Sequence, residues 1–461
     1  MPASRYVIAV DNGSQSTKVS IFDADGTVHA SARVPLRAYE SPAPGRWQHP
    51  DDDIWESIAV AIRRALESFT GNIADIAGLG LCTIRFCRAV LRADGSLAQP
   101  VMSWMDERVS RPFVAETPDA HYVTPSSGYI THRLTGTFAD TAGNYQGVWP
   151  IDAEHWDWSE DPAAYERTGM HRSMLFELVP PGGELGRVSA AAAERTGLPE
   201  GLPVFATSND KAVEALGAGL QNGSEVLISL GTYVSAMTVA SASPPPHDAY
   251  WANFGAVPGQ TLIESAGIRR GMWTVSWFRD LLSGVTEEEL GRGAEAVPPG
   301  AGGLIVSLDW LAPDDEPHRR GGIVGFDGTQ DRFHMHRAIL EALAITMSEH
   351  ISRMAEALGR QPDELIVTGG GASSHLMLEI LAAVSERPVR RPAITDAAGV
   401  GAAITAAVGT GLHAGWSEAV AAMVGDGVRV EPDPKLVAAY RTVRAEYLRV
   451  IPRVQRLFAE E

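Results

Sequence analysis

The sequence predicts an α/β fold made of two related halves. Residues 6–23 form two apolar, β-branched runs around a turn of glycine, hydroxyl and amide residues, and residues 225–239 repeat this pattern of strand, turn and strand. Between and after these hairpins, short strand-like runs alternate with segments of helical periodicity. The 461 residues also exceed what a single hydrophobic core usually organises.

The bulk composition is typical of a globular protein that binds neither nucleic acid nor membrane. A formal net charge of −19 opposes broad binding to nucleic acids or anionic lipids, so a phosphate ligand needs local donors. Two cysteines, Cys82 and Cys87, make neither a disulfide framework nor a metal-binding spacing. We find no signal-peptide core and no apolar run long enough to span a bilayer, so we expect a cytoplasmic protein. The sequence leaves open whether the protein forms a homodimer.

The tip of the first hairpin, within residues 6–23, combines the groups that can hold a terminal phosphate. A glycine permits a tight bend, polar side chains donate hydrogen bonds, a lysine adds positive charge, and an aspartate suits Mg²⁺. These residues are Gly13, Ser14, Gln15, Ser16, Lys18 and Asp11. An ordinary surface turn explains the same residues. Because a strand and not a helix follows, the stretch is neither a G-x-x-x-x-G-K-[ST] loop nor a dinucleotide fingerprint.

The first half is predicted to contain one long helix and several strands. A polar loop at 41–53 precedes the helix, whose start the carboxylates of 51–53 can cap. The strand at 101–108 ends in charges, and open α/β sheets place ligands at such strand ends. Residues 116–158 lack periodicity, and we expect turns and short helices there. In chain order, the expected elements are a helix at 54–69 and strands at 76–82, 89–91, 101–108 and 202–207.

The second half is predicted to carry a further nucleotide contact. A strand leads through the triple glycine Gly369–Gly371 into a helix N-terminus, which suits close approach of a nucleotide. We expect domains at 1–222 and 223–430, and a closing helix within 431–461 that packs back on them. The expected elements are strands at 225–230, 235–239 and 365–367 and helices at 272–282, 334–358, 376–385, 399–409 and 435–458.

Several motifs stand in one order along the chain and together resemble the FGGY family of carbohydrate kinases. The most specific is Gly322–Phe326, followed after seven residues by His334–Glu341, which departs from the family signature only at Phe326. The others are the 6–23 hairpin, Trp104–Arg108, Arg133–Gly136, Ser229–Thr232 and Gly369–Ala372. The resemblance implies two ribonuclease-H-like (actin-like ATPase) domains with a nucleotide cleft between them. It also implies ATP-dependent phosphorylation of a primary hydroxyl.

Asp210 is the candidate catalytic residue. It lies between the strand at 202–207 and a small-residue helix at 212–220, where the family keeps its catalytic aspartate. A sugar hydroxyl is a poor nucleophile, and a nearby carboxylate can accept its proton while the γ-phosphoryl group moves. An aspartate at this place caps the following helix equally well.

The resemblance further implies how the chain would hold ATP and Mg²⁺. Residues of the first hairpin would hold the γ-phosphate side, and Asp11 and Asp210 would lie near Mg²⁺. Gly231 and Thr232 would bind the β- and γ-phosphates through backbone donors. Gly370, Gly371 and Ser374 would line the adenosine, with Gly271 packing nearby. Each glycine alone is explained as well by an ordinary turn, but their matched positions in two halves favour the functional interpretation. The first-hairpin residues meant are Gly13, Ser14, Gln15 and Lys18.

The sugar site is predicted around Arg85, which follows the strand at 76–82. An arginine there can donate paired hydrogen bonds to hydroxyls, although a salt bridge at the core edge explains it too. Phe86 stands where xylulose and glycerol kinases of the family carry a polar residue. Asp106 and Arg108 either shape the cleft or form a structural ion pair. The complete predicted substrate set is Arg85, Phe86, Trp104, Asp106, Arg108, Asp210 and Lys211.

The sequence leaves the substrate open. The segment between Arg108 and Arg133 is several dozen residues shorter than in the family, and it normally helps to wall the sugar site; the region 309–320 is shortened as well. A ketopentose such as xylulose or ribulose is the first expectation, followed by a three- or four-carbon polyol or a linear dihydroxyketone signal. Alternative functions from other classes are those of an actin-superfamily ATPase and of a catalytically idle sugar sensor.

Overall fold

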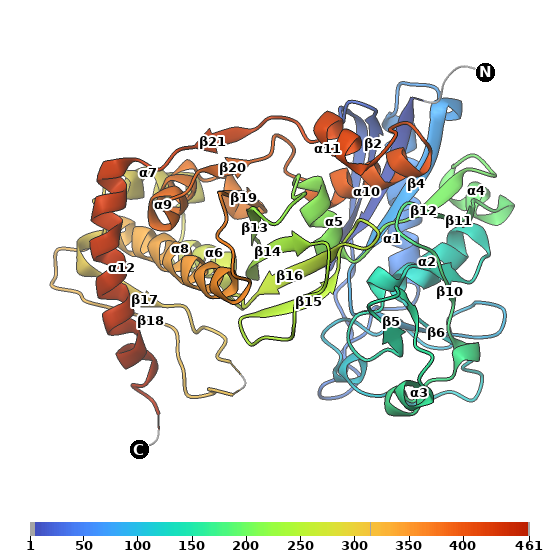
Figure 1. The fold of residues 1–461 in the computed structure, drawn as a ribbon, viewed down its shortest axis with the longest axis horizontal. Helices are drawn as coiled ribbons and strands as arrows, with labels where there is room; N and C mark the ends of the chain where they lie inside the picture. The colour runs from blue at the N-terminus through green and yellow to red at the C-terminus, as the bar shows by residue number, and fades with distance from the viewer. Residues whose placement is uncertain (1–4, 314, 460–461) are drawn as a thin grey trace.

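The computed structural model describes residues 5–313 and 315–459, which form two lobes, each built around a mixed β-sheet (Figure 1). The first sheet has the order β11-β12-β4-β1-β2-β3, and the second has the order β15-β16-β14-β13-β19-β20-β21. The strands of the first sheet are β1 Tyr6–Asn12, β2 Ser16–Asp23, β3 Val28–Pro35, β4 Ile76–Thr83, β11 Glu184–Arg187 and β12 Pro203–Ala206. Those of the second are β13 Glu225–Leu230, β14 Val234–Ala240, β15 Tyr250–Phe254, β16 Thr261–Ser265, β19 Glu364–Thr368, β20 Val389–Arg391 and β21 Val428–Val430.

Both predicted hairpins are confirmed, and each occupies the same place in its sheet. In the first, Tyr6 pairs with Asp23; in the second, Leu230 pairs with Val234 at the tip. Strand β4 lies parallel to β1, and β19 lies parallel to β13 in the same way. The duplicated α/β arrangement predicted from the sequence is therefore present.

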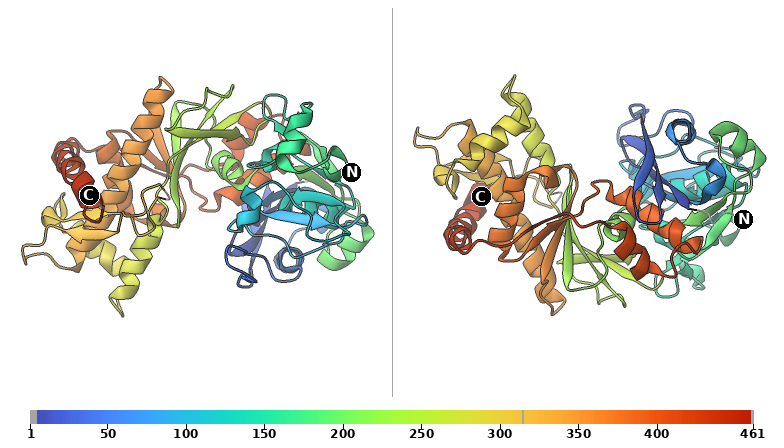
Figure 2. Two further views of the ribbon diagram at one scale, coloured as in Figure 1. Left: turned by 90° about the horizontal axis from the view of Figure 1, so that it is seen from below. Right: turned by 90° about the horizontal axis from the view of Figure 1, so that it is seen from above.

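Two helices of small residues pack between the sheets, α5 (Asp210–Gly217) and α10 (Ala397–Gly409) (Figures 1 and 2). Their buried residues form one core with apolar side chains from both sheets. Glycine makes the close contact possible, because a Cβ at Gly217 would lie 1.8 Å from the Ala397 carbonyl oxygen. Helix α10 also packs on β1 and β4 of the first sheet, although it comes late in the chain. The domain ranges 1–222, 223–430 and 431–461 stay a prediction.

The remaining elements surround these sheets. Among the described residues, no helix has both the length and the apolar composition needed to cross a bilayer. The other helices are α1 Asp53–Ser68, α2 Ser126–Thr135, α3 Pro162–Thr168, α4 Ala190–Thr196, α6 Gly271–Leu281, α7 Glu287–Glu295, α8 Arg332–Ala357, α9 His375–Ser385, α11 Trp416–Met423 and α12 Pro434–Gln455. The short strands are β5 Arg88–Leu91, β6 Tyr122–Pro125, β7 Ala139–Asp140, β8 Ile151–Asp152, β9 Asp157–Trp158, β10 Glu177–Leu178, β17 Ile305–Ser307 and β18 Gly322–Val324.

Two local predictions for the first half were wrong. The segment 101–108 is a loop that leads into a short 3₁₀ helix at Glu107–Ser110, because the Asp106 carboxylate accepts from the Arg108 backbone N–H and turns the chain. Asp52 stands at the N-cap position of α1 without capping it. Its carboxylate accepts hydrogen bonds from Tyr129 and Arg133 of α2 and so ties α2 to the start of α1.

The most specific sequence signature, His334–Glu341, anchors the closing helix. Glu341 accepts a hydrogen bond from Arg337 at 2.9 Å and one from the Tyr440 hydroxyl of α12 at 3.0 Å. Arg337 also donates to that hydroxyl at 2.8 Å. The side chains of Arg337 and Glu341 are only 5% and 4% exposed, so this signature fixes α12 to α8 through buried polar contacts.

Replacing Glu341 by alanine is expected to lower the free energy of unfolding by about 3–5 kcal/mol, because Arg337 would keep a buried charge without its partner. Denaturant unfolding of the purified variant measures the loss. The matched control is Glu446→Ala, which removes an exposed carboxylate of α12 that pairs with Arg449 and should change little. Equal stabilities of the two variants would contradict the anchoring role.

Candidate active site

The candidate base, Asp210, is the first residue of α5, just beyond the end of β12. The helix is capped by its neighbour Asn209, whose Oδ1 accepts from the Ala212 N–H at 3.0 Å. The Asn209 side-chain amide also donates to backbone carbonyls of Gly143 and Phe254. Since Asn209 performs the capping, the alternative explanation of Asp210 as the cap residue is wrong. The Asp210 carboxylate accepts from the Lys211 backbone N–H at 2.9 Å, and its side chain is 26% exposed.

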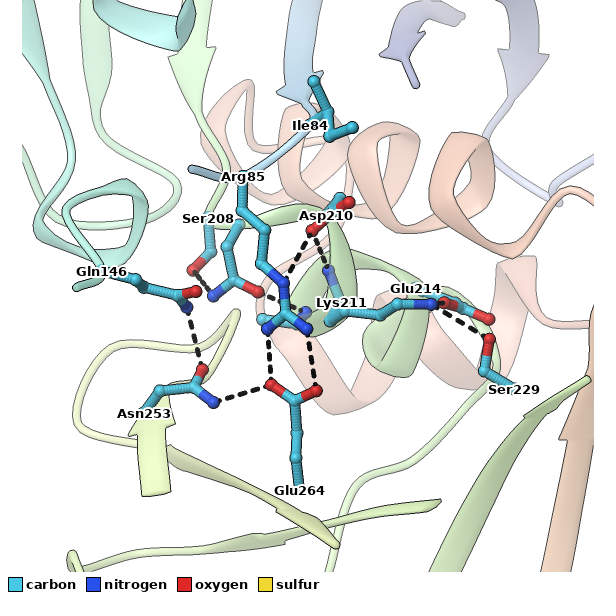
Figure 3. A network of polar contacts seen from close by, with 12 residues as sticks. Ile84, Arg85, Gln146, Ser208, Asp210, Lys211, Glu214, Ser229, Asn253 and Glu264 are labelled. Atoms are coloured by element: carbon cyan, nitrogen blue, oxygen red, sulfur yellow. Dashed lines mark hydrogen bonds and ion pairs between the residues drawn. The ribbon is translucent and has the colours of Figure 1, made fainter. Parts of the chain in front are cut away.

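Arg85 lies between Asp210 and the second lobe (Figure 3). Its two Nη atoms donate to the Glu264 carboxylate at 2.6 and 3.0 Å, and its Nε lies 3.7 Å from Asp210 Oδ1. Glu264 is on β16, so this bidentate ion pair joins the lobes beside the candidate base. A salt bridge was the alternative that we left open for Arg85, and the structure contains one.

An amide chain extends the bridge. Asn253 on β15 donates to Glu264 Oε1 at 2.8 Å, and Gln146 of the first lobe donates to Asn253 Oδ1 at 3.0 Å. Gln146 lies in the loop after a buried turn at 142–144. None of these three residues was predicted, because Glu264, Asn253 and Gln146 meet Arg85 only through the fold.

Aromatic rings enclose the Arg85 guanidinium. Phe86 stacks against Trp251 with ring centroids 6.0 Å apart, and the Arg85 Cζ lies 5.3 and 5.4 Å from the two rings. Phe86 has a φ of +67°, which is unfavourable for a bulky side chain and is found mostly where function or packing imposes it. The surroundings of Arg85 on this side are therefore apolar.

A second group of charges lies at the first hairpin. Lys18 Nζ lies 3.6 Å from Asp11 Oδ2 and 3.1 Å from Asp396 Oδ1, at the start of α10. Burial, together with the nearby charges of Asp396 and Asp210, raises the pKa of Asp11 to about 7, while Lys18 opposes the rise. Asp396 was missed, since an aspartate before a small-residue helix has no local feature that points to Lys18.

The carboxylates of the site converge at the end of β4. Burial raises the pKa of the Cys82 thiol, and four carboxylates contribute to the same direction. Cys82 pairs with Asp11 across β1 and β4. Burial also raises the pKa of Asp210, against the opposing charges of Arg85 and Lys211. The four carboxylates around Cys82 are Asp11, Asp210, Asp396 and Glu214.

Helix α5 is also bonded to the second sheet. Lys211 Nζ contacts Glu214 at 2.8 Å and the Ser229 hydroxyl of β13 at 3.1 Å. The Thr368 hydroxyl of β19 donates to Glu214 at 2.7 Å. Lys211 is thus placed beside both the candidate base and the strand that leads to the second hairpin tip.

The second hairpin tip meets the triple-glycine loop. A Cβ at Gly369 would lie 2.6 Å from the Leu230 carbonyl oxygen, so this position requires glycine, and one at Gly371 would lie 2.8 Å from Met272 Sδ. The Met272 N–H donates to the Gly231 carbonyl at 3.1 Å. The structure therefore brings together the second hairpin tip, the triple-glycine loop and the start of α6. These three segments contain five of the predicted nucleotide residues. These are Gly231, Thr232, Gly271, Gly370 and Gly371.

Three predicted nucleotide contacts already have structural partners. A Cβ at Gly271 would lie 2.3 Å from Val234, so this glycine is needed for packing. The Ser374 hydroxyl caps α9 by accepting from the Met377 N–H. The Ser14 carbonyl accepts from the Tyr39 hydroxyl at 3.0 Å, which fixes the first tip together with the Gly13 to Ser16 hydrogen bond of 3.1 Å.

Asp106 and Arg108 form a structural ion pair. Both Asp106 oxygens accept from the Arg108 guanidinium, at 2.8 and 2.7 Å, and one also accepts from the Trp47 N–H. Arg108 pairs with Glu116 as well. This supports the structural alternative that we left open. The pair braces the loop that carries the exposed Trp104, whose substrate contact stays a prediction.

The donor set suits Mg²⁺. Asp11 and Asp210 supply hard carboxylate oxygens, and a divalent cation would offset the repulsion that raises the pKa of Asp11. Within the described ranges, no group of three or more histidine, cysteine, aspartate or glutamate residues could hold an ion alone. Mg²⁺ is usually held by one or two carboxylates together with water and substrate phosphates, so this site fits it.

Comparison with known proteins agrees with this architecture. Models of the N-terminal and C-terminal domains of the FGGY family of carbohydrate kinases match residues 6–117 and 226–410. The chain is 44% identical over 433 residues to the uncharacterized sugar kinase YgcE of Escherichia coli K12, covering 92% of this chain and 88% of that protein. It is 25% identical over 500 residues to the autoinducer-2 kinase of the same strain, with coverages of 96% and 93%.

The fold is shared with solved kinases. The crystal structure of xylulose kinase from Rhodospirillum rubrum superposes with a TM-score of 0.85 at 24% sequence identity, covering 99% of this chain and 100% of that one. This confirms the two-domain, actin-like ATPase fold. With both domain models matched and a relative of 44% identity, the chain belongs to the FGGY family of carbohydrate kinases, phosphotransferases that use ATP and an alcohol acceptor.

Proposed function

We propose that the protein transfers the γ-phosphoryl group of ATP to a primary hydroxyl of a small sugar or polyol, with Asp210 as the general base. The observation that carries this proposal is the position of Asp210. Asn209, not Asp210, caps helix α5, and Asp210 is paired with Arg85. Asp210 is also the first residue of this helix, which lies between the two lobes. A carboxylate there can take the hydroxyl proton as the phosphoryl group is transferred.

The surroundings of Asp210 tune it for this task. Burial raises the pKa of Asp210, which makes the carboxylate a better proton acceptor, and the charges of Arg85 and Lys211 oppose the rise. The largely buried Arg85 to Glu264 pair joins the lobes beside it. Exclusion of water would direct the phosphoryl group to the bound alcohol rather than to hydrolysis.

We assign the nucleotide to the two hairpin tips. Backbone and side-chain donors of Gly13, Ser14, Gln15 and Lys18 would hold the γ-phosphate side, and Gly231 with Thr232 would hold the phosphates from the second lobe. Gly370, Gly371 and Ser374 would border the adenosine. Asp11 and Asp210 would hold Mg²⁺, which when bound neutralises charge on the phosphates.

The stability of the protein without Mg²⁺ is expected to fall as pH rises from 3.8 to about 7, the ordinary and the raised pKa values of Asp11. In this window the folded state binds more protons than the unfolded state, so deprotonation favours unfolding. Melting temperatures across the window, with and without Mg²⁺, measure the effect. Added Mg²⁺ should flatten the slope, and so should Asp11→Asn. An unchanged slope in that variant would contradict the assignment.

A ketopentose such as xylulose or ribulose is the first candidate substrate. The second is a three- or four-carbon polyol or a linear dihydroxyketone signal, favoured by the similarity to a protein named autoinducer-2 kinase. ADP release measured over neutral ketopentoses, polyols and dihydroxyketones tests both. Release that depends on one of these alcohols supports the proposal, whereas release independent of any alcohol would support an ATPase. The proposal places the enzyme in the cytoplasm, where ATP is available.

A further inference from the structure

The polar groups around Arg85 come from both lobes and form one connected chain (Figure 3). Gln146 and Arg85 belong to the first lobe, whereas Asn253 and Glu264 belong to the second. The successive contacts measure 3.0 Å from Gln146 to Asn253, 2.8 Å to Glu264 and 2.6 Å to Arg85. Under the function proposed above, a small alcohol with its hydroxyl on Asp210 lies within reach of this chain.

The cations of this cluster already face carboxylates. Arg85 and Glu264 are 15% and 6% exposed at their side chains, so water screens this pair little. A substrate carboxylate placed there would lie between the negative charges of Asp210 and Glu264, and the Nη donors of Arg85 are occupied. The pairs are Arg85 with Glu264 and Lys211 with Glu214.

Gln146 presents a buried acceptor without a partner. The residue is 5% exposed, and its Oε1 accepts no hydrogen bond from the residues that the structure describes. In Figure 3 its amide is directed toward the group formed by Arg85, Ser208 and Asn253. An unpaired buried acceptor is costly, and the O–H of a bound alcohol would satisfy it, while a carboxylate has no proton to donate.

We propose that the acceptor site selects uncharged sugars and polyols over sugar acids, and that Glu264 of the second lobe sets this selectivity. The inference rests on the proposed function and narrows its substrate class. Glu264 occupies the fork of donors on Arg85 that would otherwise bind a carboxylate. Its oxygens and Gln146 Oε1 accept hydrogen bonds from hydroxyl groups. Because Glu264 and Arg85 stand on opposite lobes, selection takes place when the lobes are together.

The isosteric variant Glu264→Gln tests the proposal. ADP release is measured with ketoses or polyols and with aldonic acids of the same carbon number. Wild-type protein should favour the neutral compound by about 100-fold or more in kcat/KM, since like charges in a buried site are strongly unfavourable. In the variant this ratio should fall by about tenfold or more, because Arg85 regains donors for a carboxylate. A wild-type preference for acids, or an unchanged ratio, would overturn the proposal.

Two further variants separate selectivity from folding. Glu225→Gln makes the same charge change on β13 of the same sheet, where Glu225 faces Arg390 at 3.7 Å, and should keep the wild-type ratio. Gln146→Met removes the unpaired acceptor at similar volume. This variant should raise KM for neutral substrates and leave kcat near the wild-type value. If Gln146 had only a structural role, the melting temperature would fall without a selective rise in KM.

Failure of the proposed function can be told from failure of the inference. If no alcohol supports ADP release by the wild-type protein, the proposed kinase function is wrong. Calorimetric binding of the same neutral and acidic compounds, without ATP, then decides the selectivity. Preference for the neutral compound in wild-type protein and its loss in Glu264→Gln would uphold the inference, and equal or absent binding would end it.

Discussion

Asp210→Asn should lower kcat by about 10²- to 10⁴-fold, which is the contribution expected of a general base. The amide keeps the shape of the carboxylate but cannot accept the hydroxyl proton. Binding of magnesium ATP should largely survive, since under the proposed assignment the hairpin tips would hold the phosphates and Asp11 would still be present for Mg²⁺. Turnover is measured by ADP release with saturating alcohol, and nucleotide affinity is measured by calorimetry.

The matched control for this prediction is Asp433→Asn. Asp433 also stands at a helix start, where it caps α12 by accepting from Lys435 and Leu436, but it lies outside the site. Its replacement should leave kcat near the wild-type value while lowering the melting temperature slightly. Near-normal turnover in Asp210→Asn, in a variant that binds ATP, would remove Asp210 from the mechanism.

Arg85→Leu is expected to reduce both stability and activity. It leaves Glu264 buried without its cation, which should lower the free energy of unfolding by about 3–5 kcal/mol. It also removes the charge that opposes the raised pKa of Asp210, so the acidic limb of the pH dependence of kcat/KM should move to higher pH. Denaturant unfolding and a pH profile measure the two effects.

The double variant Arg85→Leu with Glu264→Leu separates these effects. Replacing both partners removes the unpaired charge, so its stability should exceed that of Arg85→Leu, and the two single losses should not add. Activity should stay low, since the alcohol still lacks its polar contacts. Additive losses of stability would show that the pair does not couple the lobes.

The two hairpins and most helices were predictable because their signals are local. The β-branched runs of 6–23 and 225–239 specify strands, and the glycines between them specify turns, whatever the rest of the chain does. Asp210 could be predicted as the candidate base because it stands between a buried strand and a small-residue helix, at the place where the resemblance implies the catalytic aspartate. The strand predicted at 101–108 failed because the Asp106 side chain bonds to the backbone two residues later and turns the chain there.

The lobe-joining part of the site could not be predicted in the same way. Glu264 lies 179 residues after Arg85, and Asp396 lies 378 residues after Lys18, so no spacing rule connects them. Their partners are decided by which strand ends and helix starts the topology brings to one edge. Asn209 was overlooked for a different reason, since two adjacent polar residues both suit a helix start and only the backbone geometry decides between them.

The glycine contact between α5 and α10 has a consequence for the distant phosphates. A methyl group at Gly217 would overlap the Ala397 carbonyl, and one at Gly401 would overlap the Val213 carbonyl, at 1.8 and 2.0 Å. Alanine at Gly217 or Gly401 would push α5 and α10 apart at the place where both sheets pack against them. The distance between the two hairpins would then increase. The affinity for ATP should fall, although no residue that is proposed to contact ATP has changed.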